Sequence, residues 1–365
     1  MEKKILLGPE YKKYEPPLGL DDETFIQREG IINPFVLQTK KGVILLSRLI
    51  YRDKKGLNSC IVKYTASFNN KKLVLDRING EINEELIFAP GSPFGQRGVE
   101  DFRASFIEGE APLHGFLVNY DGQNTRTEYL RTSKNNPLDL HSWEKFGVWF
   151  PNIKLNEALK LVQGQGDGRY FDRWTKEYNF GDKDQLYLGT KDSCVFPLKV
   201  NGKKAVIIRL LPDMQIIYVN DLIELAKHEF WQDTIKNLED HILLKCENNW
   251  EQSHIGLAGP PFEIPEGVII PYHGARMIPQ RNYKFGIALV DKKNPKKVLA
   301  RTKKPILEAT EPWEENGVVS GKVVFPTGHA IYGSDIYLFY GSGDKYLAYS
   351  KMHKRDLLSS LQFYS

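Results

Sequence analysis

The chain has 365 residues, enough for one large domain or two ordinary domains with a sizeable core. Its 50 Lys and Arg residues balance 46 Asp and Glu residues to a net charge of +4, and no basic run carries interleaved aromatic residues, so no nucleic-acid partner is expected. No apolar stretch reaches the length of a membrane span and the N-terminus lacks a signal-peptide core, so we expect a cytoplasmic protein with no membrane partner.

Short apolar or alternating runs, separated by turns rich in Gly, Asn and Asp, are typical of an all-β fold. In chain order, strands are predicted at residues 42–51, 113–120, 203–211, 267–274, 284–291 and 335–341. Residues 220–238 have helical spacing, with a candidate N-cap at Asn220. Residues 152–190, rich in Gly, Asp and Tyr, are predicted to form an insertion or a long loop.

A unit of two strands, with polar residues at their ends, recurs along the chain. About five such units, spaced roughly 45 to 75 residues apart, predict the blades of a β-propeller with one or two helical insertions. Two packed β-sandwiches are the alternative from the pattern alone. Because the inner strands of a propeller converge on its axis, we expect residues from five different units to share one central funnel: Arg48, Asp101, Arg209, His273 and Asp344.

Residues 97–106, RGVEDFRASF, are difficult to explain as core. On a regular strand, alternation would give each face both apolar and charged side chains. Burial of an unpaired carboxylate is costly, so Asp101 must be paired, solvated or used in chemistry.

Nothing in the sequence predicts a metal or nucleotide cofactor. The three cysteines are far apart, and the eight histidines show no spacing typical of metal ligands. The glycine-rich run at 164–168 lacks the lysine and the strand–helix context of a nucleotide loop.

Seven segments, in the same order along the chain, resemble signatures of glycoside hydrolase family 130, which comprises β-mannoside phosphorylases and related hydrolases. They are GVEDFR (98–103), VFPLKVNGKKAVIIR (195–209), IGLAGPP (255–261), YHG (272–274), YKFGIALVDKKNPKKVLARTKKPILE (283–308), VVFPTG (323–328) and YGSGD (340–344). The resemblance implies a five-bladed β-propeller at residues 33–350. An N-terminal extension at 1–32 is expected to pack on it, and a tail follows at 351–365.

The resemblance also implies the chemistry. Asp101 matches the proton donor of the family, which acts on the glycosidic oxygen through the 3-hydroxyl of the mannose. Inorganic phosphate is then the co-substrate, and no cofactor is needed. A phosphate dianion is already a nucleophile, whereas water requires a second carboxylate as general base, so one carboxylic acid suffices.

Further site residues follow from the same resemblance. The phosphate ligands of the family map onto Lys191, Arg209, His254, His273 and Tyr283. The sugar-binding residues map onto Asn33, Arg48, Arg103 and Asp344.

Two of the positions that depart from the family pattern bear directly on the site. Phe102 stands where the family usually has Pro, and His254 stands where it has Lys. A histidine with an ordinary pKa near 6.5 is mostly neutral at about pH 7.5, so His254 would supply little positive charge to a phosphate site.

The function that these residues favour is an inverting phosphorylase of a β-mannoside, of the manno-oligosaccharide or mannosyl-glucose type. The alternatives are a β-mannoside hydrolase, with Glu263 as the nearest base, and a non-catalytic carbohydrate-binding propeller. The partner is a small oligosaccharide, and the resemblance also implies a homo-oligomer.

Overall fold

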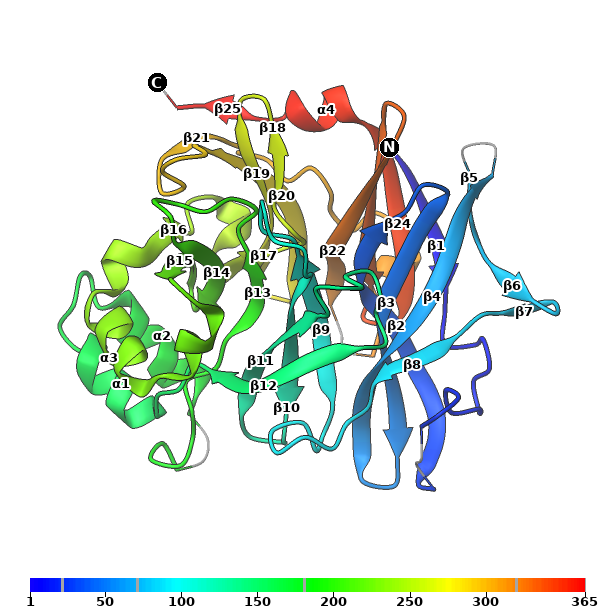
Figure 1. Cartoon of the computed structure of the whole chain (residues 1–365), viewed down its shortest axis with the longest axis horizontal. Helices are drawn as coiled ribbons and strands as arrows, with labels where there is room; N and C mark the ends of the chain where they lie inside the picture. The colour runs from blue at the N-terminus through cyan, green and yellow to red at the C-terminus, as the bar shows by residue number, and fades with distance from the viewer. Residues whose placement is uncertain (21–22, 70–71, 180–181, 319–320, 365) are drawn as a thin grey trace.

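The computed structural model describes residues 1–20, 23–69, 72–179, 182–318 and 321–364 (Figure 1). Strands dominate this part of the chain and the helices are short, so the fold is mostly β, in line with the all-β class with helical insertions predicted from the sequence. No helix among the described residues has both the length and the apolar character needed to cross a membrane.

Three sheets follow one another from the N-terminus. The first sheet contains β2 (Phe25–Gln38), β3 (Gly42–Asp53), β4 (Gly56–Asn69), β5 (Lys72–Leu75) and β8 (Glu85–Phe88). The second contains β9 (Val99–Ser105), β10 (His114–Tyr120), β11 (Thr125–Thr132) and β12 (Trp143–Phe150). The third contains β13 (Lys191–Val195), β14 (Lys204–Leu210), β15 (Asp213–Val219) and β16 (Ile242–Leu244). A small hairpin is formed by β6 (Arg77–Ile78) and β7 (Glu81–Ile82).

The C-terminal half forms a ten-stranded sheet in two groups. The first group contains β17 (His254–Leu257), β18 (Phe262–Ile264), β19 (Gly267–Arg276), β20 (Asn282–Val290), β21 (Val298–Arg301) and β25 (Gln362–Phe363). The second contains β22 (Lys322–Tyr332), β23 (Asp335–Ser342), β24 (Tyr346–His353) and β1 (Glu2–Leu7). Only two parallel residue pairs among those described join the groups, between β20 and β22. β1 pairs with β24, so the two ends of the chain share one sheet.

Helices interrupt the strands in two main places. α1 (Leu155–Val162) and α2 (Arg169–Glu177) lie between β12 and β13, within the region predicted as an insertion or loop. η1 (Leu222–Ala226), α3 (His228–Lys236) and η2 (Leu238–His241) lie between β15 and β16. Short elements elsewhere are η3 (Asn249–Glu251), η4 (Pro312–Glu314) and α4 (Lys354–Leu358).

The single helix predicted at 220–238 is wrong in detail. Asp221, not Asn220, caps the first turn, because its side chain accepts from the backbone N–H of Ile223 while Glu224 accepts from the backbone N–H of Asp221. Lys227 then takes an extended conformation and ends this 3-10 turn before α3 begins.

Buried apolar clusters lie between successive groups of strands. One cluster, for example, packs Phe35 of β2 and Ile61 of β4 against Phe102 of β9 and Leu117 of β10. Another joins the β22–β24 group back to the β2–β5 sheet, so the last group of strands packs against the first. Strands covered on both faces need apolar residues on both, which explains continuous apolar runs such as AVII at 205–208.

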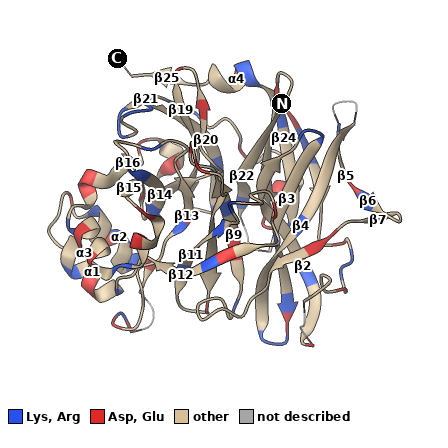
Figure 2. Ribbon diagram, in the orientation of Figure 1, with Lys and Arg blue, Asp and Glu red and all other residues tan. Residues whose placement is uncertain are grey.

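The first strands of these groups lie toward the middle of the molecule (Figure 1). β2 contacts both β22 and β9, β9 contacts β13, and β13 contacts β17. Figure 2 shows charged residues on these central strands as well as on the periphery. Side chains far apart in the sequence therefore meet at the centre.

Candidate active site

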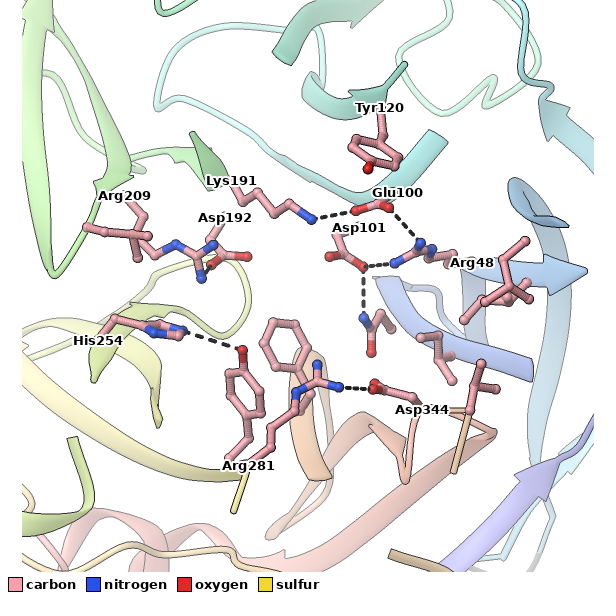
Figure 3. Close-up of a pocket in the computed structure, with 18 of the residues that line it drawn as sticks. Arg48, Glu100, Asp101, Tyr120, Lys191, Asp192, Arg209, His254, Arg281 and Asp344 are labelled. Atoms are coloured by element: carbon pink, nitrogen blue, oxygen red, sulfur yellow. Dashed lines mark hydrogen bonds and ion pairs between the residues drawn. The ribbon is translucent and has the colours of Figure 1, made fainter. Parts of the chain in front are cut away.

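A cavity of about 470 Å³ lies at this centre (Figure 3). It is lined by most of the site residues predicted from the sequence: Asn33, Arg48, Asp101, Lys191, Arg209, His254, Tyr283 and Asp344. Arg103 and His273 do not line it and are fully buried behind its wall. The structure thus gathers these eight residues in one cavity and places the other two in supporting positions.

The same backbone irregularity occurs in three inner strands. In β2, β9 and β13, two residues oppose one on the neighbouring strand, which is the pattern of a β-bulge. Each bulge contains a residue with a left-handed backbone: Asn33 (φ 49°), Asp101 (φ 43°) and Asp192 (φ 58°). Asn and Asp tolerate this conformation better than other residues with a side chain. The bulges therefore turn three polar side chains into the cavity.

The bulge in β9 explains the charged stretch at 97–106. Regular alternation is wrong for these residues, because Glu100 and Asp101 both line the cavity. Phe102 instead points into the core, where its ring lies edge-on to Phe35 and Trp143. Complete burial of a Phe side chain contributes roughly 1.5–3 kcal/mol. Phe102 thus anchors the strand that presents Asp101.

Asp101 is a buried carboxyl group with several polar neighbours. Its Oδ1 accepts a hydrogen bond from Asn33 Nδ2 at 2.8 Å and lies 3.9 Å from Arg48 Nη1. Burial acts to raise the pKa of Asp101, but the positive charges of Arg48 and Lys191 outweigh it and hold the pKa below its usual value. Asp101 is therefore ionised at neutral pH in the unliganded site.

Glu100 joins two cations beside Asp101. Its Oε1 lies 2.6 Å from Arg48 Nη2, and its Oε2 lies 2.5 Å from Lys191 Nζ. Burial favours the neutral form of Glu100, yet these two cations lower its pKa as well. Glu100, which the sequence reasoning did not select, fixes Lys191 close to Asp101.

Asp192 was also missed, and it is the centre of a second network. Its Oδ1 lies 2.7 Å from Arg103 Nη2, and its Oδ2 lies 2.7 Å from Arg209 Nη1. Arg103 additionally donates to the backbone carbonyls of Asp101 and Leu257. Arg103, predicted to bind sugar, instead connects the backbone of Asp101 to Asp192 from behind the cavity.

An aromatic and imidazole wall lies next to Arg209. His254 Nε2 is 3.4 Å from the hydroxyl of Tyr283, and the ring of His273 packs on Phe325 at 4.4 Å. Burial and the charge of Arg209 lower the pKa of both histidines well below the usual value. The ordinary pKa expected for His254 is therefore wrong, and both rings are neutral at physiological pH.

Asp344 forms the opposite side of the cavity. Its carboxylate pairs with the guanidinium of Arg281, a residue the sequence reasoning missed. Burial acts to lower the pKa of Arg281, but Asp344 outweighs it and raises the pKa. The backbone of Asp344 is left-handed (φ 51°), and the residue lies just after the end of β23. This carboxylate therefore also lies where the backbone departs from regular strand geometry.

Three tyrosines and the candidate hydrolytic base have different positions. Tyr120 lines the cavity, whereas Tyr272 and Tyr340 are core residues that donate to Glu251 and Glu314. Glu263, named as a hydrolytic base, lies outside the cavity on β18 and pairs with Lys292 at 3.3 Å. Glu263 therefore cannot activate water at Asp101.

The described residues contain no group of three or more His, Cys, Asp or Glu side chains that could hold a metal ion. The cavity instead combines a carboxyl group, a neighbouring carboxylate and several cations. This arrangement suits an enzyme that cleaves a glycosidic bond with an anionic nucleophile.

Comparison with known proteins agrees with this class. The family model described as beta-1,4-mannooligosaccharide phosphorylase matches residues 25–362, so the chain belongs to glycoside hydrolase family 130. The resemblance found in the sequence is thereby confirmed.

Three relatives are informative. A 1,2-beta-oligomannan phosphorylase of Thermoanaerobacter sp. (strain X514) is 35% identical over 257 residues, which cover 67% of this chain and 79% of that protein. A beta-1,2-mannobiose phosphorylase of the same organism is 35% identical over 250 residues, which cover 66% of this chain and 76% of that protein. The structure of beta-1,2-mannobiose phosphorylase from Listeria innocua has a TM-score of 0.69 at 20% identity, with 99% of each chain covered.

Proposed function

We propose that this protein is an inverting phosphorylase that cleaves a β-mannoside with inorganic phosphate and releases α-mannose 1-phosphate. The observation that carries the proposal is the position of Asp101 beside a cluster of cations in one cavity. The relatives with the highest identity quoted above are named for β-1,2-linked mannose, so β-1,2-mannobiose and longer β-1,2-oligomannans are the substrates to test first.

In the proposed reaction, a phosphate oxygen attacks the anomeric carbon from the face opposite the leaving group. The bond between that carbon and the glycosidic oxygen breaks, and the oxygen receives a proton from Asp101 through the mannose 3-hydroxyl. One displacement inverts the configuration, so a β-mannoside gives the α-phosphate ester. Asn33, which donates to Asp101, orients the acid.

The ionised state of Asp101 in the unliganded site has a consequence for this step. An acid that is deprotonated at neutral pH must acquire its proton when the substrates bind. The negative charge of phosphate opposes the field of Arg48 and Lys191, so phosphate binding favours the protonated form of Asp101. Phosphate binding is therefore coupled to the uptake of a proton by Asp101.

The remaining residues have distinct proposed roles. Arg209, Tyr283 and His254 hold phosphate on one side of the cavity, and Lys191 lies between this group and Asp101. The mannose is bound by Asn33, Arg48 and Asp344 on the other side. Arg103 and His273 act from behind the wall and orient Asp192 and Arg209.

Hydrolysis is the second candidate, and Asp192 is the observation that favours it. This carboxylate lines the cavity and could accept a proton from water. However, its two oxygens are already engaged by Arg103 and Arg209. Basic residues at positions 191 and 209 suit phosphate better than water.

We further propose that the groups of strands form a five-bladed propeller. Buried apolar clusters lie between each successive pair of groups, and the last group packs on the first, which supports five blades. The propeller would span residues 33–350, with β1 of the N-terminal extension completing the last blade. The cytoplasmic location and the homo-oligomer inferred from the sequence remain predictions.

Synthesis from the sugar phosphate tests the function. The protein is incubated with α-mannose 1-phosphate and a panel of acceptors, including mannose, β-1,2-mannobiose and glucose, and released phosphate is measured. The proposal expects acceptor-dependent phosphate release with one or more acceptors of the panel. If none of the acceptors supports phosphate release, and the protein cleaves β-1,2-mannobiose in the absence of phosphate, the protein is a hydrolase.

A further inference from the structure

The cations assigned to phosphate from the sequence are largely committed to other groups. Lys191 is paired with Glu100, and Arg209 is paired with Asp192. His254 replaces the lysine of the family and is neutral at physiological pH. A phosphate dianion at this end of the cavity therefore requires a further positive charge.

Helix α2, part of the insertion between β12 and β13, is fixed next to Arg209. The indole of Trp174 donates to the backbone carbonyl of Leu211, two residues after Arg209, at 2.8 Å. The hydroxyl of Tyr170 and the guanidinium of Arg169 both bind Asp213, at 2.8 and 2.9 Å. These contacts hold one face of α2 against the turn between β14 and β15.

Arg173 precedes Trp174 on this helix, and its side chain lines the cavity. Its Nη2 pairs with Glu177 one turn later at 2.9 Å, and Glu177 is itself exposed at the cavity. Its buried Nε makes no hydrogen bond. The positive charges of Arg173 and Arg209 both act on His254. Arg173 is thus a cation on the His254 side of the cavity, and its partner Glu177 is exposed, whereas the partners of Lys191 and Arg209 are buried.

We propose that Arg173 is a second guanidinium ligand of the phosphate, supplied by the inserted helix in place of the missing lysine at position 254. A guanidinium can bind two phosphate oxygens at once, and its charge does not change with pH. The same contact would apply to the phosphate of α-mannose 1-phosphate. The inference rests on the proposed phosphorylase function and adds a residue specific to this insertion.

Substitution of Arg173 tests the role. Arg173→Ala is expected to raise the KM for phosphate by about tenfold to a hundredfold, while the KM for the β-mannoside changes less than about twofold. Arg173→Lys retains the charge and should recover part of the loss. Lys176→Ala, an exposed change on the same helix, is the matched control and should leave both constants unchanged.

A compensating change gives the sharpest result. In Arg173→Ala, the additional change His254→Lys places a cation on the same side of the cavity and should restore most of the phosphate affinity. An unchanged phosphate KM in Arg173→Ala, or an equal rise for phosphate and mannoside, would overturn the assignment.

Binding of inorganic phosphate, measured by calorimetry, separates this inference from the proposed function. Phosphate that binds the unaltered protein, and binds Arg173→Ala at least tenfold more weakly, supports Arg173 even if no mannoside is cleaved. Equal binding to both proteins overturns Arg173, whereas phosphate release from α-mannose 1-phosphate would still support the phosphorylase.

Discussion

Arg209 Nη1 lies 2.7 Å from Asp192 Oδ2, and the other oxygen of the same carboxylate lies 2.7 Å from Arg103 Nη2. One buried carboxylate thus bridges a guanidinium from β14 and one from β9. For the proposed phosphate ligand, the bridge fixes the orientation of Arg209 in advance, which would reduce the entropy lost on binding. It also neutralises part of the charge of Arg209, so phosphate must compete with Asp192.

The first prediction concerns Arg209. Arg209→Ala removes a charge-assisted partner of the phosphate and should raise the KM for phosphate by an amount equivalent to about 2 kcal/mol. The KM for the mannoside should change little, because Arg209 lies away from Arg48 and Asp344 (Figure 3). Initial rates at varied phosphate and fixed mannoside give this value. A larger effect on the mannoside than on phosphate would remove Arg209 from the anion site.

Asp101 carries the second prediction. Asp101→Asn retains the shape and can still meet Asn33 but cannot supply the proton, so turnover should fall by about two to three orders of magnitude or more. Because Asn also tolerates a left-handed backbone, the midpoint of urea unfolding should stay close to that of the unaltered protein. A well-folded variant with more than about a tenth of the original rate would show that the proton comes from elsewhere.

Gly256 provides a steric prediction. A Cβ at this position would lie 2.5 Å from Asp192 Oδ2 and 2.6 Å from the ring of His273. Gly256→Ala should therefore displace Asp192 and misorient Arg209. We expect this loss of orientation to outweigh the relief of competition with Asp192, so phosphate binding should weaken by about tenfold. Gly333→Ala is a suitable comparison for added bulk, since a Cβ there meets nothing within 4 Å, although its φ of 61° makes that backbone strained. Normal phosphate kinetics in Gly256→Ala would show that Asp192 can move freely.

The fourth prediction concerns pH. Burial and Arg209 lower the pKa of His254, so the ring loses its proton well below the usual pKa and stays neutral as the pH rises further. The KM for phosphate, corrected for the ionisation of phosphate itself, should therefore show no change caused by titration of His254 between roughly pH 6 and 8. His254→Lys should lower that constant across the whole range. A step in the unaltered protein that disappears in His254→Lys would mean that His254 titrates in the anion site.

Much of the centre of the molecule could be predicted from the sequence. The repeat of paired strands placed residues as distant as Arg48 and Asp344 in one cavity, because inner strands converge whatever their separation in the chain. The family motifs then pointed to Asp101, which lines this cavity. The strand predictions at 42–51 and 335–341 correspond to β3 and β23, since continuous apolar runs between turn residues leave little freedom.

The details that set the chemistry were less accessible. Asp192 was missed, although it follows Lys191 along the chain as Asp101 follows Glu100. Its φ of 58° shows that it shares the left-handed backbone conformation of Asp101. The recurrence of Asn33, Asp101 and Asp192 in inner strands is a signal that could have identified it. Arg173 offered no such signal, because the docking of α2 depends on tertiary contacts such as that between Trp174 and Leu211.

The products formed from β-1,2-mannobiose in phosphate buffer test the central claim most directly. Phosphorus and proton NMR follow the reaction from its first minutes, with a phosphate-free reaction alongside. The account predicts α-mannose 1-phosphate and mannose in equal amounts, with no cleavage when phosphate is omitted. Two mannose molecules per disaccharide, with no phosphate ester and the same rate in both buffers, would contradict it.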